Sequence, residues 1–192
     1  AMSSPARYLE EASDLANEGK LWAAADHLMA GFADLGDAAD APETDSLGRP
    51  IRGSAPKMMD KAADWLDFLD NLEADGAEVA EGTPPRHMRW AQWHALNGQA
   101  EVRRRHPGRA IDHLELAAGL FGSDGMHAQE IPLLAQVAMC QLEVRDVPRA
   151  EEALNRALAA RTALAARDAG AAARFREMLD SVAAEVTARL NP

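Results

Sequence analysis

The chain has 192 residues, enough for one sizeable domain or for a short array of repeats. Alanine is common and only 5% of the residues are aromatic, a composition typical of an all-α fold. The formal net charge is −11, from 31 acidic and 20 basic residues, and a field of this sign repels phosphate backbones and argues against nucleic acid as a partner.

Eight helices are predicted from the hydrophobic period and from the positions of proline and glycine. The first spans residues 5–17 with Ser4 as its N-cap, and the second spans 21–35 and ends at Gly36. Residues 37–56 contain three prolines and two glycines and have no hydrophobic period. A long flexible loop is therefore expected over 37–56.

The rest of the chain continues the helical pattern. A third helix begins between Ser54 and Pro56, and a break at 76–83 follows it. The next predicted helices span 85–104, 107–120, 127–144 and 148–167. Gly170 then separates a final amphipathic helix, 171–190, which is expected to cap the fold.

Three helix pairs share one pattern of small and large residues. In each second helix, an alanine is followed by an aliphatic residue four positions on and by small or apolar residues seven and eight positions on. These positions are Ala24, Leu28, Gly31 and Phe32; Ala110, Leu114, Ala117 and Ala118; and Ala150, Leu154, Ala157 and Leu158. A small residue lets two antiparallel helices approach closely, and each pair must stack on the next to bury its second face.

The pattern resembles the tetratricopeptide (TPR) repeat, over somewhat more than half of the chain. The small places of the first helices match Ala12, Asn97 and Ala138, and the large places match Tyr8, Trp93 and Leu134. Asn97 stands where the family usually has glycine. The 40-residue spacing of the second and third repeats exceeds the family's usual 34 and is closer to a variant found in bacterial regulators.

The resemblance implies a fold for the whole chain. It predicts a right-handed α-solenoid of about three TPR-like helix pairs, forming a single domain over residues 1–192. The helix around 56–75 fits no repeat and is expected to be an extra element, and 171–190 is expected to be the capping helix. Within the second pair, the predicted core residues Trp93, Leu96 and Ala100 face Ala110 and Leu114, with Trp90 one turn back on the same side.

The resemblance also implies a function. In solenoids of helix pairs, the first helices line a concave groove that holds a peptide or a partner helix. The matching positions here are Leu9, Ser13, Asn17, Ala91, His94, Gly98, Glu101, Ala135, Met139 and Leu142. We therefore expect a protein-interaction scaffold, for example a bacterial regulatory or chaperone module, that binds another protein or peptide.

Two other classes of function stay open at this point. Exposed apolar end faces could pair into a homodimer, which would make the chain a structural or assembly protein. A helical domain that binds a small ligand or acts as an enzyme would use His87, His94 and the arginines.

The sequence contains no catalytic motif, so no enzymatic activity and no cofactor are expected. There is no Gly-x-Ser-x-Gly sequence, no glycine-rich phosphate loop and no His-Glu-x-x-His sequence. His87 and His94 are seven residues apart, too far to bind one metal ion on a straight helix. Cys140 lies in an apolar helical run and is expected to be a buried, inert thiol.

The only basic cluster surrounds the sequence RRRH at 103–106. It either complements the dipole at a helix C-terminus or forms a pocket for a carboxylate or an acidic peptide. The candidate anion-binding residues are Arg86, Arg103, Arg104 and Arg109.

The distribution of apolar residues along the chain indicates where in the cell the protein is expected. No run of about 18 apolar residues is present, so no membrane partner is expected. The N-terminal stretch AMSSPARYLEEA lacks the apolar core of a signal peptide, and a cytoplasmic location is therefore predicted.

Overall fold

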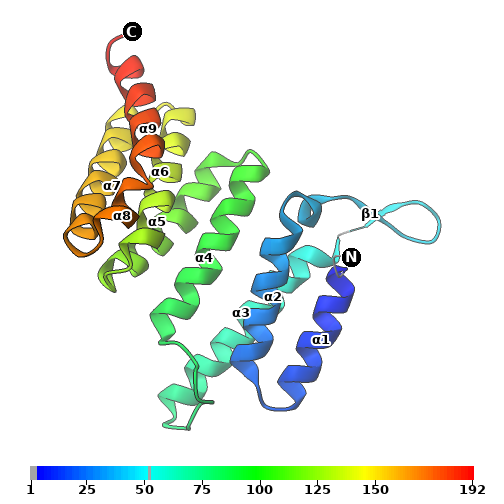
Figure 1. Cartoon of the computed structure of the whole chain (residues 1–192). Coiled ribbons are helices and arrows are strands. Elements are labelled where there is room, and N and C mark those ends of the chain that lie inside the picture. Colours follow the sequence, from blue (N-terminus) through cyan, green and yellow to red (C-terminus); the bar gives the residue numbers. More distant parts are fainter. Residues whose placement is uncertain (1–3, 52) are drawn as a thin grey trace. The chain divides into compact units, whose positions relative to one another are not determined.

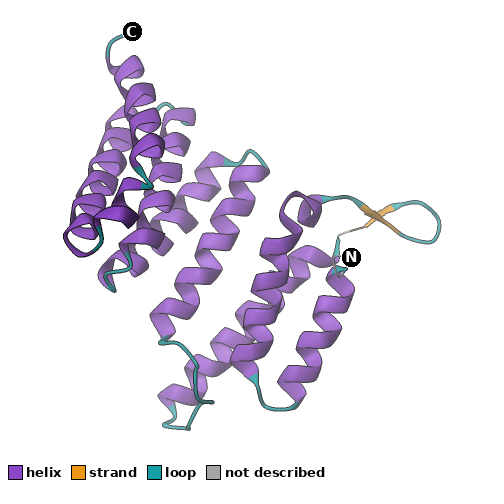
Figure 2. Ribbon diagram, in the orientation of Figure 1, coloured by secondary structure: helices purple, strands orange, loops and turns teal. Residues whose placement is uncertain are grey.

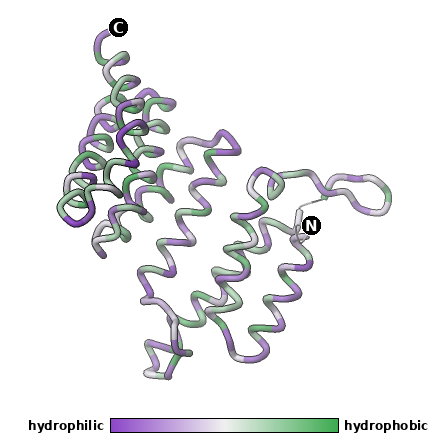
Figure 3. The backbone as a smooth tube through the Cα atoms, viewed as in Figure 1, coloured by the Kyte–Doolittle hydropathy of each residue, from purple (hydrophilic) through white to green (hydrophobic). Residues whose placement is uncertain are grey.

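The computed structural model describes residues 4–51 and 53–192, and these are largely helical (Figure 2). The predicted all-α class is confirmed, with one two-stranded hairpin as the only sheet among the described residues. Hydrophilic and hydrophobic residues alternate along the helices (Figure 3), as expected for helices that bury one face. The chain divides into two compact units, Ala1–Leu96 (unit 1) and Asn97–Pro192 (unit 2), which are described separately, and the single domain expected over residues 1–192 stays a prediction.

Unit 1 is built on three packed helices, labelled in Figure 1. They are α1 (Pro5–Asn17), α2 (Leu21–Leu35) and α3 (Ser54–Ala74), and each of them contacts the other two. At the crossing of α1 and α2, a Cβ atom placed on Gly31 would lie 2.6 Å from the ring of Tyr8. The ring can therefore pack against α2 only because residue 31 has no side chain.

The segment predicted as a flexible loop contains short regular elements, and α3 begins inside it. The 3₁₀ helix η1 (Gly36–Asp40) is followed by an antiparallel hairpin of β1 (Glu43–Thr44) and β2 (Pro50–Ile51). The Asp45 carboxylate accepts hydrogen bonds from the backbone N–H groups of Leu47 and Arg49, both at 2.9 Å. These local hydrogen bonds close the hairpin turn. They cannot be predicted from the spacing of hydrophobic residues.

The helix α4 (Arg86–Arg103) contains the boundary between the units. Unit 2 continues with α5 (Pro107–Ser123), α6 (His127–Glu143), α7 (Val147–Arg167), α8 (Ala169–Ala173) and α9 (Arg176–Leu190). Within it, α6 contacts α5 and α7, and α9 contacts α6 and α7.

The repeat positions form much of the core of the two units. Eleven of the twelve second-helix positions are buried, and Leu158 is half-buried. In unit 2 the residue that meets Leu114 is Gly98, because a Cβ atom there would lie 2.7 Å from the Leu114 side chain. The predicted close approach of α4 and α5 is therefore present, and Gly98 is the small residue that allows it.

The predicted capping helix is two helices. The side chain of Asp168 accepts a hydrogen bond from the N–H of Ala171 at 3.0 Å and so caps the short helix α8. The break that the sequence marks at Gly170 lies at Asp168, and Gly170 is inside α8. A second turn, at Arg174 and Phe175, separates α8 from α9.

Candidate functional site

A hollow of about 380 Å³ in unit 2 is the strongest candidate for a binding site, and we call it the unit-2 groove. Its lining residues are Gln99 and Val102 of α4, Pro132, Ala135, Gln136, Met139, Cys140 and Glu143 of α6, and Met178, Ser181 and Val182 of α9. The lining is mainly apolar, although the groove is open to solvent. Met139 is 37% exposed and Met178 is 40% exposed.

Helical spacing explains why these side chains meet. On α6 the lining residues recur every three or four positions from Pro132 to Glu143, which places them on one face. Met178 and Val182 are likewise four residues apart on α9. Methionine is unbranched and polarizable, so a surface with a methionine on each of two helices can adapt to apolar side chains of different shapes.

The groove contains part of the predicted set. Ala135 and Met139 line it, whereas Leu142 is only 2% exposed and presents almost no surface to a partner. Gly98 is buried against Leu114. The sequence analysis did not identify the lining residues on α9, because it expects the final helix to cover the core and not to flank a groove.

Glu101 is committed to contacts inside unit 2. Its carboxylate accepts hydrogen bonds from Arg104 at 3.0 Å and from His106 Nδ1 at 2.9 Å. Burial alone would raise the pKa of the Glu101 carboxyl, but these bonds outweigh it and hold the pKa below its ordinary value. Glu101 thus binds residues that follow the end of α4, and it is not among the residues that line the groove.

The predicted anion-binding arginines are divided between the two units. Arg86 belongs to unit 1 and pairs with Asp70 at 3.0 Å. In unit 2, Arg104 pairs with Glu101, Arg103 is half-buried at the end of α4, and Arg109 is exposed on α5. The guanidiniums of Arg86 and Arg104 are therefore already neutralised by carboxylates of the chain itself.

The remaining predicted groove positions belong to unit 1. Leu9 and Ser13 are half-buried on α1 and Asn17 is exposed at its end, whereas Ala91 on α4 is fully buried. His94 is half-buried, and its ring lies 5.1 Å from that of Trp93 between centroids. His94 therefore belongs to an aromatic cluster.

That cluster contacts α3 within unit 1, and the expected packing of Trp93 toward Leu114 stays a prediction. The indole N–H of Trp93 donates to the carbonyl oxygen of Met59 at 2.9 Å, and that of Trp90 donates to Asp70 at 2.8 Å. Both polar ends of these rings are satisfied within unit 1. These contacts agree with the interpretation of the two tryptophans as packed residues and not as a ligand platform.

Arg89, beside the cluster, is 0% exposed. Its guanidinium donates to Asp70 at 2.8 Å, to Glu73 at 2.5 Å and to the carbonyl oxygen of Pro84 at 2.9 Å. Burial would raise the pKa of Asp70, but the bonds from Arg89 and Trp90 and the charge of Arg86 outweigh it and lower the pKa. These ion pairs fasten the start of α4 to α3.

Cys140 is 3% exposed, as its apolar surroundings predict. Burial, with a smaller contribution from the charge of Glu143, raises the pKa of its thiol to about 11. The thiol is therefore protonated at neutral pH, although it lines the unit-2 groove. It contributes apolar surface there and lacks the thiolate that nucleophilic chemistry requires.

A second cavity in unit 2, of about 370 Å³, has a polar lining. It lies between α5, α6 and α7, and the ion pair of Arg156 with Glu115, at 3.0 Å, spans two of these helices. That ion pair joins α5 to α7 across the cavity.

In the part of the chain that the structure describes, no group of three or more His, Cys, Asp or Glu side chains is placed to hold a metal ion. None of the helices over 4–51 and 53–192 has both the length and the hydropathy needed to cross a bilayer. Comparison with protein-family models, with curated proteins and with solved structures finds no match for this chain.

Proposed function

We propose that this protein is a non-catalytic interaction module whose unit-2 groove holds an apolar segment of another polypeptide. The observation that carries the proposal is the open, mainly apolar hollow between α4, α6 and α9, with a half-exposed methionine on each of two facing helices. Its volume of about 380 Å³ is within the roughly 300–1,000 Å³ typical of ligand sites. A hollow at the low end of that range suits a few anchoring side chains from a longer segment.

The pattern of helix contacts supports a TPR-like arrangement. Within unit 2, α7 contacts the next long helix, α9, and α6 contacts α9 as well. Stacked helix pairs produce such contacts, and α9 then occupies the place of the first helix of a following pair. On this basis the unit-2 groove corresponds to the concave, first-helix face of the repeat family.

Charge narrows the class of partner. Glu143 lines the groove, is exposed and has no hydrogen-bond or ion-pair partner among the described residues. An apolar segment flanked by a lysine or arginine would place its cation beside this carboxylate. The proposed partner is thus an amphipathic helix with apolar residues three or four positions apart and a basic residue at its edge. A regulatory or chaperone role and a cytoplasmic location remain predictions from the sequence.

The test begins with selection of peptides from a displayed library on the full chain, followed by affinity measurement by fluorescence anisotropy. Selected peptides should share the apolar spacing and basic flank, and Met139→Glu and Met178→Glu should each weaken their binding by tenfold or more. Leu116→Glu is the matched control, because Leu116 is 52% exposed on α5 and does not line the groove. Binding that survives both groove substitutions would refute the proposal.

Sedimentation velocity provides the second measurement. A homodimer that forms with rising concentration and is lost in Met139→Glu would assign the groove to a second copy of this chain and overturn the proposed partner. A monomer at high concentration would leave the groove free for another polypeptide, as proposed.

A further inference from the structure

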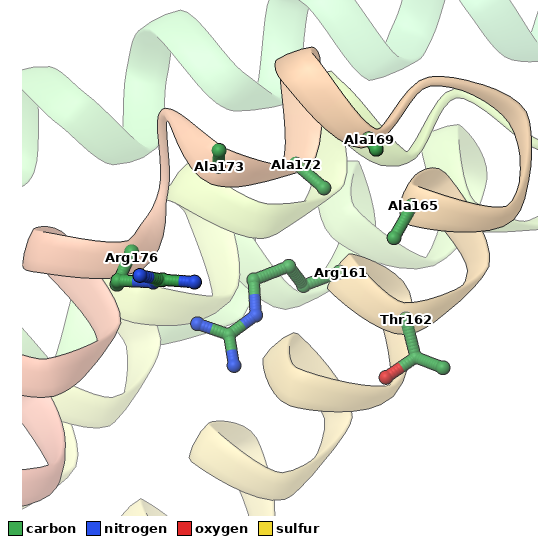
Figure 4. A pocket seen from close by; sticks show the side chains of 7 residues that line it. All are labelled: Arg161, Thr162, Ala165, Ala169, Ala172, Ala173 and Arg176. Atoms are coloured by element: carbon green, nitrogen blue, oxygen red, sulfur yellow. The ribbon is translucent and has the colours of Figure 1, made fainter.

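A separate hollow of about 270 Å³ lies between α7, α8 and α9, on residues that the proposed function does not use (Figure 4). Its lining residues are Arg161, Thr162, Ala165, Ala169, Ala172, Ala173 and Arg176. Figure 4 shows the side chain of Arg161 extending toward Arg176, with both guanidinium groups at the same side of the hollow. Alanine methyl groups make up most of the remaining lining.

Neither cation is neutralised by a carboxylate in the described part of the chain. Among the described residues, Arg161 and Arg176 form no ion pair or hydrogen bond with a carboxylate, whereas Arg86, Arg104 and Arg156 all do. Arg176 also lies in the first turn of α9, a helix of 15 residues, where the helix dipole is positive and already disfavours a cation. Two uncompensated guanidiniums at one hollow make a local positive potential in a chain whose net charge is −11.

The chemistry of the lining indicates the ligand. A guanidinium presents a planar fork of N–H donors that matches a carboxylate or a phosphate. The alanines offer methyl groups, which favour an aliphatic group and give nothing to the outer oxygens of a phosphate. The Thr162 hydroxyl donates to the carbonyl oxygen of Leu158 at 3.1 Å, so its proton is not directed at the hollow.

We propose that this hollow binds an organic monocarboxylate with a short aliphatic chain, its carboxylate between Arg161 and Arg176 and its methylene groups against the alanines. The proposal is independent of the unit-2 groove, since the two hollows share no lining residue. A ligand here would contact α7, α8 and α9 together, and would therefore stabilise the turn at Arg174 and Phe175.

The test is a titration of the full, ¹⁵N-labelled chain with hexanoate, acetate or inorganic phosphate at constant ionic strength, followed by NMR. The amide signals of Ala169, Ala172 and Ala173 should shift and saturate with hexanoate. Acetate should bind more weakly, since each additional buried methylene tightens binding by up to about fourfold. Arg161→Gln and Arg176→Gln should each weaken hexanoate binding by about tenfold or more, because each removes a charge-assisted donor pair.

Arg174→Gln is the matched control. It removes an exposed arginine from the same segment, outside the hollow, and should leave hexanoate affinity within about twofold of the original chain. Circular dichroism melting of each variant establishes that it is folded. Shifts that do not saturate, hexanoate affinity that both hollow variants retain, or phosphate binding as tight as hexanoate binding would each overturn the proposal.

Discussion

Gly98 is the residue at which the α4 backbone meets Leu114 in unit 2, and Gly98→Ala probes that crossing. The added Cβ atom would lie 2.7 Å from both Cγ and Cδ2 of Leu114, and 3.2 Å from its backbone nitrogen. Contacts of 2.7 Å are well inside van der Waals distance, so Leu114 or the helix must move. Overpacking of this kind costs about 1–3 kcal/mol. Alanine in place of glycine inside a helix returns about 0.5–1 kcal/mol, so the expected result is a net loss.

Gly119→Ala isolates the helix-propensity part of this balance. Gly119 lies inside α5, and a Cβ atom there would meet nothing within 4 Å. This control should stabilise the protein by about 0.5–1 kcal/mol. The two substitutions should therefore differ by the overpacking cost of about 1–3 kcal/mol in the free energy of unfolding.

Urea denaturation followed by circular dichroism at 222 nm measures this difference. Leu114→Ala supplies an internal check, because it removes Cγ and Cδ2, the two side-chain atoms that the new Cβ would overlap. In that background the Gly98 substitution should cause no further loss of stability. A difference below about 0.5 kcal/mol between the Gly98 and Gly119 variants, or an equal loss with and without Leu114, would refute the close helix crossing.

Four other predictions concern buried residues and ion pairs. Leu154 is 6% exposed, and Leu154→Ala should lose about 2–5 kcal/mol in urea denaturation, whereas a loss below about 1 would contradict the pairing of α7 with its neighbours. Arg89→Ala should lose roughly 3–5 kcal/mol at pH 7, because it leaves Asp70 and Glu73 without their buried cation. The pKa of Asp70 is lowered on folding, so its ion pairs stabilise the fold above the ordinary carboxyl pKa of 3.8 and lose that effect as the pH falls through the lower, folded pKa. The loss caused by Asp70→Asn should accordingly shrink on acidification, and a loss that is constant from pH 7 to pH 2 would contradict this role. Cys140, with its pKa raised to about 11, should react with iodoacetamide at pH 7.5 far more slowly in the folded chain than in urea, as mass spectrometry can follow, and equal rates would contradict its burial.

Local signals predicted the helix boundaries well where caps and breakers act through neighbouring residues. Ser4 caps α1 through a hydrogen bond from the N–H of Arg7, and α2 ends just before Gly36, as predicted. The break after α7 lies at Asp168, whose side chain caps α8, and glycine alone placed it two residues too late, at Gly170. The hairpin depends on hydrogen bonds to Asp45, which no periodicity reports.

Contacts between distant residues limited the prediction of the site. The small and large positions of the repeat located Ala135 and Met139, because both lie on one face of a single helix. Met178 joins them only because α9 returns to contact α6, and sequence spacing does not reveal that contact. Arg89 presents the same difficulty, since its carboxylate partners lie 16 and 19 residues earlier on another helix.

The most direct test of the unit-2 groove is NMR of the full chain with ¹³C-labelled methionine methyl groups, titrated with a selected amphipathic peptide. The signals of Met139 and Met178 should shift and show intermolecular contacts to the apolar side chains of the peptide, while those of the buried residues Met58 and Met59 should stay in place. Bound peptide that leaves Met139 and Met178 unchanged at saturation would contradict the assignment of this groove as the polypeptide-binding site.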